Sequence, residues 1–365
     1  MIESRSPALT ILIAAGGTGG HVYPALEVAR RLRARGVNVE WLGTRKGLES
    51  RLVPGEGFPL HVLSIGGLRG KGILRWLAAP LVLLFALGRA VSVIRAVRAR
   101  LVLGMGGYAA GPGGVAAWLL RVPLLIHEQN AVPGLTNRIL ARFASRVLEA
   151  FPGSFPQRVG AIHVGNPVRA DICALDPPER RMAGHEGPLR LLVLGGSQGA
   201  RVLNRVLPAA LAGLPPGIRV EIRHQTGAAD VAASREAYAA AGLDVSPVAY
   251  IEDMAGAYAW ADLVVCRAGA MTVSELAAAG IAAIFVPFPF AVDDHQWKNA
   301  RYLSDAGAAV LVREPELNPA LLNDLIVEFG QARQRLKEMA RRARGLGIPD
   351  AAERVADLCV EAAHA

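Results

Sequence analysis

The stretch DLVVCRAGAMTVSELAAAGIAAIFVPFPFAVDDHQWKNA, residues 262–300, indicates how the chain is organised. Residues 263–266 form a short apolar run with two valines, which predicts a buried strand. Residues 272–279 favour a helix, and Gly280 is expected to end it because glycine tolerates left-handed backbone. Residues 281–286 predict a second buried strand. The stretch therefore predicts a strand–helix–strand unit with parallel strands.

This unit carries groups that suit a nucleotide diphosphate. Backbone N–H groups at the start of the helix and the nearby Arg267 suit a phosphate. Glu275, one turn into the helix, suits the paired hydroxyls of a ribose. In a parallel sheet, ligands bind where strands end and helices begin. We therefore expect a nucleotide-diphosphate site here.

Length and composition predict two domains in a reducing compartment. The chain has 365 residues, of which 52% are apolar, enough for two domains of about 150–200 residues each. Its three cysteines form no CxxC or Cys/His cluster, which argues against structural zinc and disulfides. Glu3 and Arg5 precede the first apolar run, so we expect no signal peptide.

The charge is divided unequally between the two halves of the chain. Residues 1–168 carry 20 Lys and Arg against 7 Asp and Glu, a net charge of +13, whereas residues 169–365 carry 20 against 24, a net charge of −4. A basic first half could meet nucleic acid or an anionic membrane.

Two similar glycine-rich turns predict two Rossmann-like domains in tandem. The turn at residues 16–21, GGTGGH, follows an apolar strand and precedes a helix, and the turn at residues 195–200, GGSQGA, has the same setting. The first turn is not the dinucleotide motif GxGxxG, because Val22 occupies the last glycine position. The segment 151–187 is rich in Pro, Gly and charge, so we place the domain boundary near residue 168.

Two further segments of the first half predict a ligand site. A second glycine cluster occupies residues 104–114. The sequence HEQN at residues 127–130 follows a strand predicted at 122–126. Because the carboxyl ends of parallel strands open on the ligand crevice, we expect these four polar side chains to serve a site.

The most apolar segment of the chain is residues 73–94. Its longest run without charged residues, 76–88, is 13 residues long, whereas about 20 apolar residues are needed to span a bilayer. Two interpretations remain: a helix buried in the core, or a helix with one face on the protein and apolar side chains on a membrane surface. Basic residues around the segment favour some membrane contact. They are Arg69, Lys71, Arg75 and Arg89.

Several motifs are absent from the sequence. It contains no GxxxxGK[ST], HExxH or GxSxG motif and no aromatic RNA-binding strand. These absences argue against hydride transfer, NTP hydrolysis, metalloproteolysis and serine hydrolysis.

Seven motifs, in order along nearly the whole chain, resemble the bacterial MurG family of N-acetylglucosaminyltransferases. They are GGTGGH at 16–21, GMGGY at 104–108, HEQN at 127–130, GNPVR at 165–169, GGSQGAR at 195–201, HQTG at 224–227 and RAGAMTVSE at 267–275.

The resemblance implies an α/β protein of the GT-B fold, with two Rossmann-like doubly wound domains facing a central cleft. Residues 1–168 would bind the acceptor and the membrane, and the C-terminal helix, about 345–365, would join them. Residues 169–344 would bind the UDP-sugar donor.

The resemblance also implies the reaction. N-acetylglucosamine would pass from UDP-N-acetylglucosamine to the muramoyl 4-hydroxyl of undecaprenyl-diphosphate-muramoyl-pentapeptide, with inversion, in peptidoglycan synthesis. The enzyme would need no cofactor and no metal. It would lie peripherally on the cytoplasmic side of the cell inner membrane, with the anionic membrane surface as a partner and no nucleic acid.

The resemblance assigns residues to the donor site by position. Ile251 would contact uracil through its backbone, Glu275 the ribose, Ser197 the diphosphate and Gln296 the sugar hydroxyls. The complete expected set is Thr18, Gly19, Gly20, Asn130, Arg169, Ser197, Ile251, Ala270, Met271, Thr272, Val273, Ser274, Glu275 and Gln296. Met271 stands where the family has Leu, a change that conserves volume.

An inverting transfer needs a base for the acceptor hydroxyl. His21 is the first candidate, because an imidazole titrates near neutral pH, and Glu128 is the second. His21 could instead bind the acceptor diphosphate as a hydrogen-bond donor. The alternative functions are another GT-B UDP-sugar transferase, a UDP-sugar 2-epimerase, or a non-enzymatic scaffold on a membrane surface.

Overall fold

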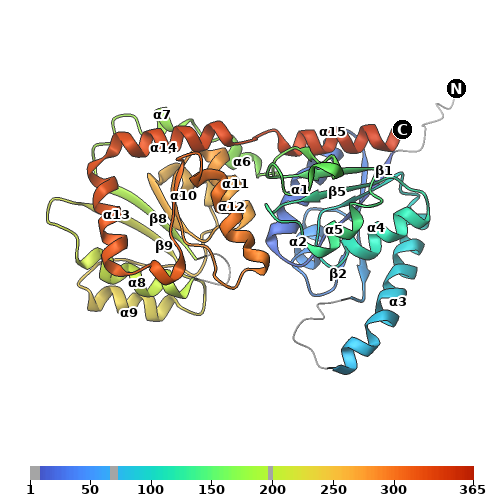
Figure 1. The fold of residues 1–365 in the computed structure, drawn as a ribbon, viewed down its shortest axis with the longest axis horizontal. Coiled ribbons are helices and arrows are strands. Elements are labelled where there is room, and N and C mark those ends of the chain that lie inside the picture. Colours follow the sequence, from blue (N-terminus) through green and yellow to red (C-terminus); the bar gives the residue numbers. More distant parts are fainter. Residues whose placement is uncertain (1–8, 66–72, 196–199) are drawn as a thin grey trace. The chain divides into compact units, whose positions relative to one another are not determined.

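The structure is a computed structural model that describes residues 9–65, 73–195 and 200–365. The chain divides into two compact units (Figure 1). The first comprises Met1–Arg169 and Pro349–Ala365, and the second comprises Ala170–Ile348.

The first unit contains a seven-stranded parallel sheet in the order β3-β2-β1-β4-β5-β6-β7. The strands are β1 Thr10–Ala14, β2 Asn38–Thr44, β3 Leu60–Leu63, β4 Leu101–Gly104, β5 Leu124–Glu128, β6 Arg146–Glu149 and β7 Ile162–His163. The order of strands reverses between β1 and β4. In doubly wound sheets the ligand crevice lies at such a switch point.

Helices pack on both faces of this sheet. Successive side chains of β1 point to opposite faces, and all of them are buried, so both faces must be covered. Ile11 and Ile13 belong to one apolar cluster, with residues of α1 and α15. Leu12 and Ala14 belong to the other, with residues of α3 and α4. The helices of this unit are α1 Gly19–Ala34, α2 Glu49–Gly55, α3 Ile73–Val97, α4 Ala110–Leu119, α5 Leu135–Leu140, α15 Ala351–His364 and the 3₁₀ helix η1 Gln157–Val159.

Helix α15, the last element of the chain, is part of the core of the first unit. Val355 and Cys359 are fully buried in the cluster that contains α1. Arg35 of the α1–β2 turn pairs with Glu353 at 2.5 Å, and Arg146 of β6 pairs with Glu361 at 2.5 Å. The C-terminus therefore completes a domain that the N-terminus begins.

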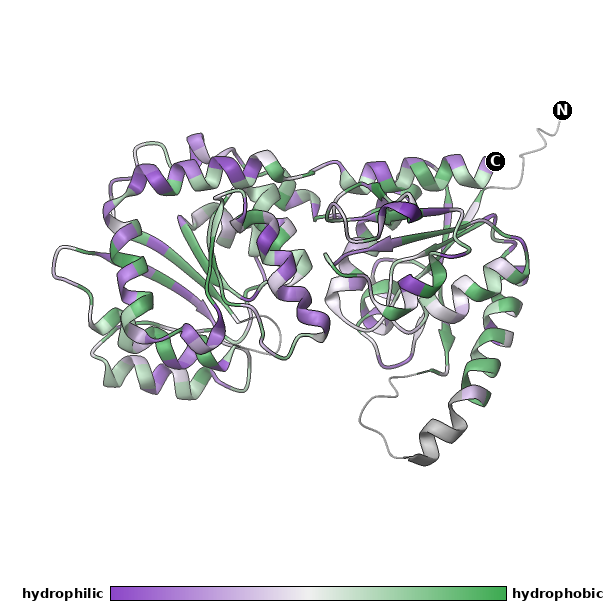
Figure 2. Ribbon diagram, in the orientation of Figure 1, coloured by the Kyte–Doolittle hydropathy of each residue, from purple (hydrophilic) through white to green (hydrophobic). Residues whose placement is uncertain are grey.

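Helix α3 is buried on one side in its second half and exposed in its middle. Ala86, Ala90 and Val93 are buried against the rest of the unit. Residues 80–85 are exposed on all sides, with Phe85 77% exposed. Figure 2 shows that the coloured part of this helix is mostly hydrophobic. A buried core helix is therefore the wrong interpretation for residues 80–85.

The second unit contains a five-stranded parallel sheet in the order β12-β11-β10-β8-β9. Its strands are β8 Leu189–Leu194, β9 Val220–Gln225, β10 Leu263–Cys266, β11 Ala282–Phe285 and β12 Ala309–Leu311. Its α-helices are α6 Ala170–Cys173, α7 Pro178–Arg181, α8 Arg201–Ala212, α9 Val231–Ala240, α10 Met254–Trp260, α11 Ala270–Ala279, α12 His295–Ser304, α13 Pro319–Gln331 and α14 Arg333–Leu346. Two 3₁₀ helices, η2 Val292–Asp294 and η3 Glu314–Glu316, complete it.

A strand is expected at residues 245–250, but the structure has only an isolated bridge between Gln225 and Val248. Pro247 has no N–H to give to a ladder, so pairing cannot extend through it. The bridge still lies at the edge of the sheet next to β9. If the segment around Val248 is counted as a strand, the order of the second sheet matches that of β3-β2-β1-β4-β5-β6 in the first sheet.

The stretch at 262–300 folds as predicted. β10 and β11 are fully buried parallel neighbours, and α11 connects them. Gly280 caps α11 with left-handed backbone, at φ 66° and ψ 66°.

Candidate active site

The turn after β1 places the start of α1 at the switch point of the first sheet. Thr18 is the N-cap residue, and α1 begins at Gly19. The expected donor-contacting residues Thr18, Gly19 and Gly20 therefore present backbone N–H groups at a helix N-terminus, where an anion is stabilised. His21 stands on the first turn of the same helix and is partly buried.

The second glycine cluster packs directly against this turn. A Cβ on Gly107 would lie 1.9 Å from the carbonyl oxygen of Gly16, and a Cβ on Gly106 would lie 2.6 Å from Nδ1 of His21. Both glycines have positive φ, which disfavours side chains as well. The loops after β1 and β4, which flank the switch point, thus meet as one surface.

Glu49 holds the first glycine turn in place, a role that the sequence analysis missed. This carboxylate is fully buried at the start of α2. Its Oε2 accepts from the N–H of Gly17 at 2.8 Å, and its Oε1 accepts from the N–H and the hydroxyl of Thr44 at 2.8 and 2.7 Å. An acidic residue among glycines in a strongly basic half of the chain was the available signal.

The HEQN segment forms an internal hydrogen-bond network, which differs from the expected row of ligand-facing side chains. His127 and Glu128 belong to β5 itself, and both are buried, as is Gln129. Burial lowers the pKa of His127 to about 4, so its imidazole is neutral at physiological pH.

Glu128 is saturated by donors of its own loop. Its Oε1 accepts from the backbone and side-chain N–H groups of Asn130 at 3.0 and 3.2 Å. Its Oε2 accepts from the N–H of Gly134 at 3.0 Å and from Nδ2 of Asn137 at 2.9 Å. These four hydrogen bonds fix the position of the carboxylate and orient Asn130.

In the second unit, α11 begins directly after β10, beside the switch point between β8 and β10. Six of the expected donor-site residues, 270–275, form its first turn and a half. Glu275 is partly exposed, and its Oε2 accepts from the hydroxyl of Tyr258 at 2.9 Å. Tyr258 is buried in α10, so this hydrogen bond fixes the direction of the carboxylate.

Arg267 does not point to this helix start, contrary to expectation. Its Nη1 donates to the carbonyl oxygens of Val286 and Pro287 at 3.0 and 3.2 Å and pairs with Glu314 at 2.5 Å. The guanidinium thus ties the loop after β10 to the loop after β11. The anion-binding groups that α11 offers are its backbone N–H groups.

The remaining expected residues lie in separate loops. The N–H of Ile251 donates to Oε1 of Gln225 at 2.9 Å, which fixes the segment before α10. Gln296, on α12, accepts from the N–H of Phe288 at 2.9 Å and closes the loop after β11. Arg169 is the last residue of the first unit before the chain crosses over. Ser197 lies outside the described residues.

Comparison with known proteins agrees with this arrangement. Residues 11–149 match the glycosyltransferase family 28 N-terminal domain, and residues 190–355 match the C-terminal domain of the same family. A relative from Alkalilimnicola ehrlichii is 58% identical over 98% of this chain and 99% of its own, and one from Ralstonia nicotianae is 56% identical over 98% and 97%. Both are named UDP-N-acetylglucosamine–N-acetylmuramyl-(pentapeptide) pyrophosphoryl-undecaprenol N-acetylglucosamine transferase.

Among solved structures, MurG of Acinetobacter baumannii matches 97% of this chain and its own whole length, with a TM-score of 0.85 and 44% identity. A UDP-N-acetylglucosamine 2-epimerase matches with a TM-score of 0.66 at 13% identity, a likeness of fold alone. Identity above one half over nearly the whole length, with both domains matched, settles the relationship. The chain belongs to glycosyltransferase family 28 and, within it, to the MurG family.

Proposed function

We propose that the protein transfers N-acetylglucosamine from UDP-N-acetylglucosamine to the 4-hydroxyl of the muramoyl unit of undecaprenyl-diphosphate-muramoyl-pentapeptide. The observation that carries the proposal is the start of α11 beside Glu275, in a chain 58% identical to a relative named for this reaction. The helix start suits the donor diphosphate and Glu275 suits its ribose. These groups, with Ile251 and Gln296, form the donor site of the second unit.

The transfer is a single displacement that inverts the anomeric centre. The acceptor oxygen forms a bond to the anomeric carbon while the bond from that carbon to the diphosphate oxygen breaks, and UDP leaves. The N-terminus of α11 stabilises the growing negative charge on the diphosphate. The acceptor hydroxyl gives its proton to a base in the first unit.

His21 is the base in this proposal. It lies on the first turn of α1, directly after the expected donor-contacting residues Thr18, Gly19 and Gly20. Glu128 suits the role poorly, because its four hydrogen bonds are used to hold its own loop.

The first unit also supplies a membrane-facing surface in this proposal. Leu81, Leu84 and Phe85 of α3 are 61%, 63% and 77% exposed. By length and composition alone, residues 80–97 could cross a membrane, but the face with Ala90 and Val93 packs inside the unit. The helix therefore suits the surface of an anionic bilayer. The net charge of +13 on residues 1–168 would attract the protein to that surface.

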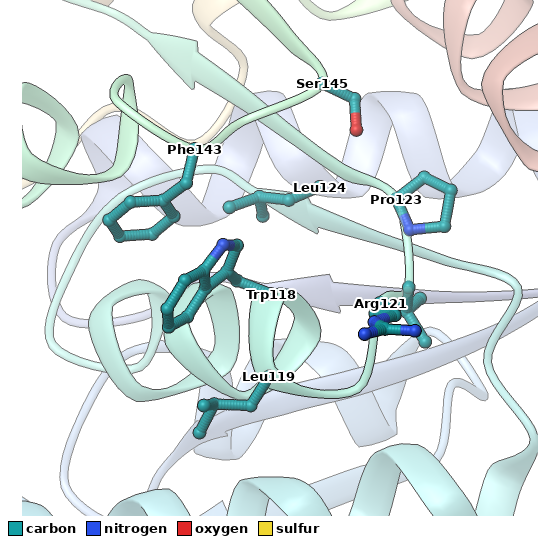
Figure 3. A pocket seen from close by; sticks show the side chains of 8 residues that line it. Trp118, Leu119, Arg121, Pro123, Leu124, Phe143 and Ser145 are labelled. Atoms are coloured by element: carbon teal, nitrogen blue, oxygen red, sulfur yellow. The ribbon is translucent and has the colours of Figure 1, made fainter.

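A second apolar feature of this unit lies at the end of α4, which packs against α3. Trp118 and Leu119 are about half exposed and border a hollow of about 440 Å³ (Figure 3). Phe143 lies beside Trp118 at a ring distance of 5.6 Å, and Arg121 also lines the hollow. The hollow lies at the amino-terminal end of β5, the edge of the parallel sheet opposite the loops after β1 and β4, so it takes no part in the proposed reaction.

The test is transfer of labelled N-acetylglucosamine to a short-chain lipid-diphosphate-muramoyl-pentapeptide. We expect product with UDP-N-acetylglucosamine and little with UDP-glucose or UDP-galactose. Conversion of UDP-N-acetylglucosamine without any lipid would instead indicate an epimerase. Vesicle binding without donor binding would indicate a scaffold.

A further inference from the structure

A chain of hydrogen bonds leads from the buried interior of the first unit to His21. Nε2 of His127 lies 2.9 Å from the carbonyl oxygen of Gly165. Nδ1 of His127 lies 3.2 Å from Nε2 of Gln129, which also donates to the carbonyl oxygen of Met105 at 3.0 Å. Oε1 of Gln129 lies 3.0 Å from Nδ1 of His21.

The positions of the protons in this series of hydrogen bonds follow from its buried end, where His127 meets the carbonyl oxygen of Gly165. The carbonyl oxygen of Gly165 can only accept, so Nε2 of His127 carries a proton. Because burial keeps this imidazole neutral, its Nδ1 carries no proton and accepts a hydrogen bond from Nε2 of Gln129.

The orientation of the Gln129 amide is fixed as well. Its nitrogen faces two acceptors, the Met105 carbonyl oxygen and Nδ1 of His127, and has two protons for them. A flipped amide would place oxygen against both. Oε1 therefore faces His21, and since this oxygen only accepts, Nδ1 of His21 must be the donor.

We infer that Gln129 is a positioning residue that holds His21 in the Nδ1–H tautomer, so that Nε2 carries the lone pair. The inference rests on the proposed function, in which His21 takes the proton of the acceptor hydroxyl. In that step the proton moves to Nε2, and the imidazolium keeps its Nδ1–H donated to Oε1. A neutral amide thus orients the base as a carboxylate does in a serine protease.

The surroundings make this orientation rigid. Gln129 is 1% exposed, and its backbone carbonyl accepts from Nδ2 of Asn166 at 3.0 Å. The His21 ring is confined by Gly106, whose missing side chain leaves the space that the ring needs. A free imidazole would distribute its proton over both nitrogens, and only one of these forms can accept at Nε2.

The tautomer can be read directly by NMR on the intact chain labelled with ¹⁵N-histidine. Long-range correlations between ring nitrogens and ring protons distinguish Nδ1–H from Nε2–H. The His21→Gln variant identifies the His21 signals among the eight histidines. We expect Nδ1–H for His21 near neutral pH. An Nε2–H signal in the native chain would overturn the inference, whatever the activity.

Two substitutions at Gln129 separate orientation from packing. Gln129→Met conserves length but cannot accept, so we expect a mixed tautomer and a kcat lower by about tenfold or more, with KM for the donor unchanged. Gln129→Glu keeps an acceptor toward His21 and should retain Nδ1–H, even if the loss of its two donors lowers stability. A native-like tautomer in Gln129→Met would contradict the inference.

A double variant distinguishes failure of this inference from failure of the proposed base. His21→Gln should lower kcat by about 10²–10⁴, and adding Gln129→Met should lower it little further, because both act through one group. If His21→Gln retains kcat, His21 is not the base, and the NMR result still decides its tautomer. Fully additive losses would mean that Gln129 acts independently of His21.

Discussion

Glu49 and Glu275 are both carboxylates near a turn that leads from a strand into a helix, but their surroundings differ. Glu49 is fully buried and accepts three hydrogen bonds from the turns that it joins. Glu275 is partly exposed and accepts from Tyr258. The hydrogen bonds of Glu49 are all internal to the protein, whereas Glu275 is the carboxylate to which the proposed function gives the ribose.

Glu275→Ala should weaken binding of UDP-N-acetylglucosamine by about 1.5–3 kcal/mol, the usual contribution of a hydrogen bond to a charged group. Isothermal titration calorimetry measures this difference. Tyr258→Phe is the matched control, because it removes only the hydroxyl that orients the carboxylate and should have a smaller effect. Unchanged donor affinity in Glu275→Ala would remove its ribose role.

Glu49→Gln should destabilise the first unit by about 1–3 kcal/mol and lower turnover. The amide keeps the shape of the side chain, but its NH₂ group would face N–H or O–H donors of Gly17 or Thr44. Denaturant unfolding measures the stability. Asp357→Asn, an exposed change in the same unit, should have little effect. Equal stability in the two variants would show that the charge of Glu49 is dispensable.

Among the elements, those governed by local pattern were predictable and those governed by packing were not. The strands of 262–300, their helix and its Gly280 cap follow from apolar runs and from a left-handed glycine. Which apolar residues of α3 are exposed depends on what packs against them, and periodicity cannot show that in a uniformly apolar run.

The candidate site divides in the same way. That a helix follows the small-residue turn after each buried strand was predictable, but its first residue was not: the second helix is expected at Thr272 and begins at Ala270. The partners of Arg267, Glu128 and Glu49 were not, because each hydrogen-bonds to a loop whose position only the folded chain determines.

The exposed apolar residues of α3 allow the proposed membrane contact of this helix to be tested. Replacing Leu81, Leu84 and Phe85 together with Ser should reduce binding to anionic vesicles by about tenfold or more, since each side chain loses about 1.5–3 kcal/mol of burial in lipid. Vesicle sedimentation measures the binding. Unfolding by denaturant should be nearly unchanged, because these residues are exposed.

Val93→Ser, on the buried face of the same helix, is the matched control and should instead lower stability. Undiminished vesicle binding in the triple variant would place the membrane contact elsewhere. Binding that RNA abolishes would indicate a general polyanion surface.

For the molecule as a whole, two buried histidines predict a loss of stability in mild acid. Burial lowers the pKa of His127 in the first unit and of His224 in the second to about 4, from 6.5. Between these values the unfolded chain binds more protons than the folded chain. The free energy of unfolding therefore falls as pH drops from about 6.5 to about 4, by up to about 1.4 kcal/mol per pH unit for each histidine.

Denaturant unfolding at a series of pH values across this window measures the effect. His224→Gln should reduce the slope for the second unit only, because His127 lies in the first. Stability that stays constant or rises toward pH 4 would contradict the prediction.

The return of α15 to the first unit makes the second unit an insertion in the polypeptide. Residues 170–348 lie between Arg169 and Pro349 of the first unit. The first unit is therefore encoded by two separate segments of the gene, and the second unit by one. A gene fragment that stops at the crossover would leave the first unit without α15, the helix that packs against α1. The second unit can be exchanged as one uninterrupted segment, so under the proposed function donor preference should move between relatives with residues 170–348 alone.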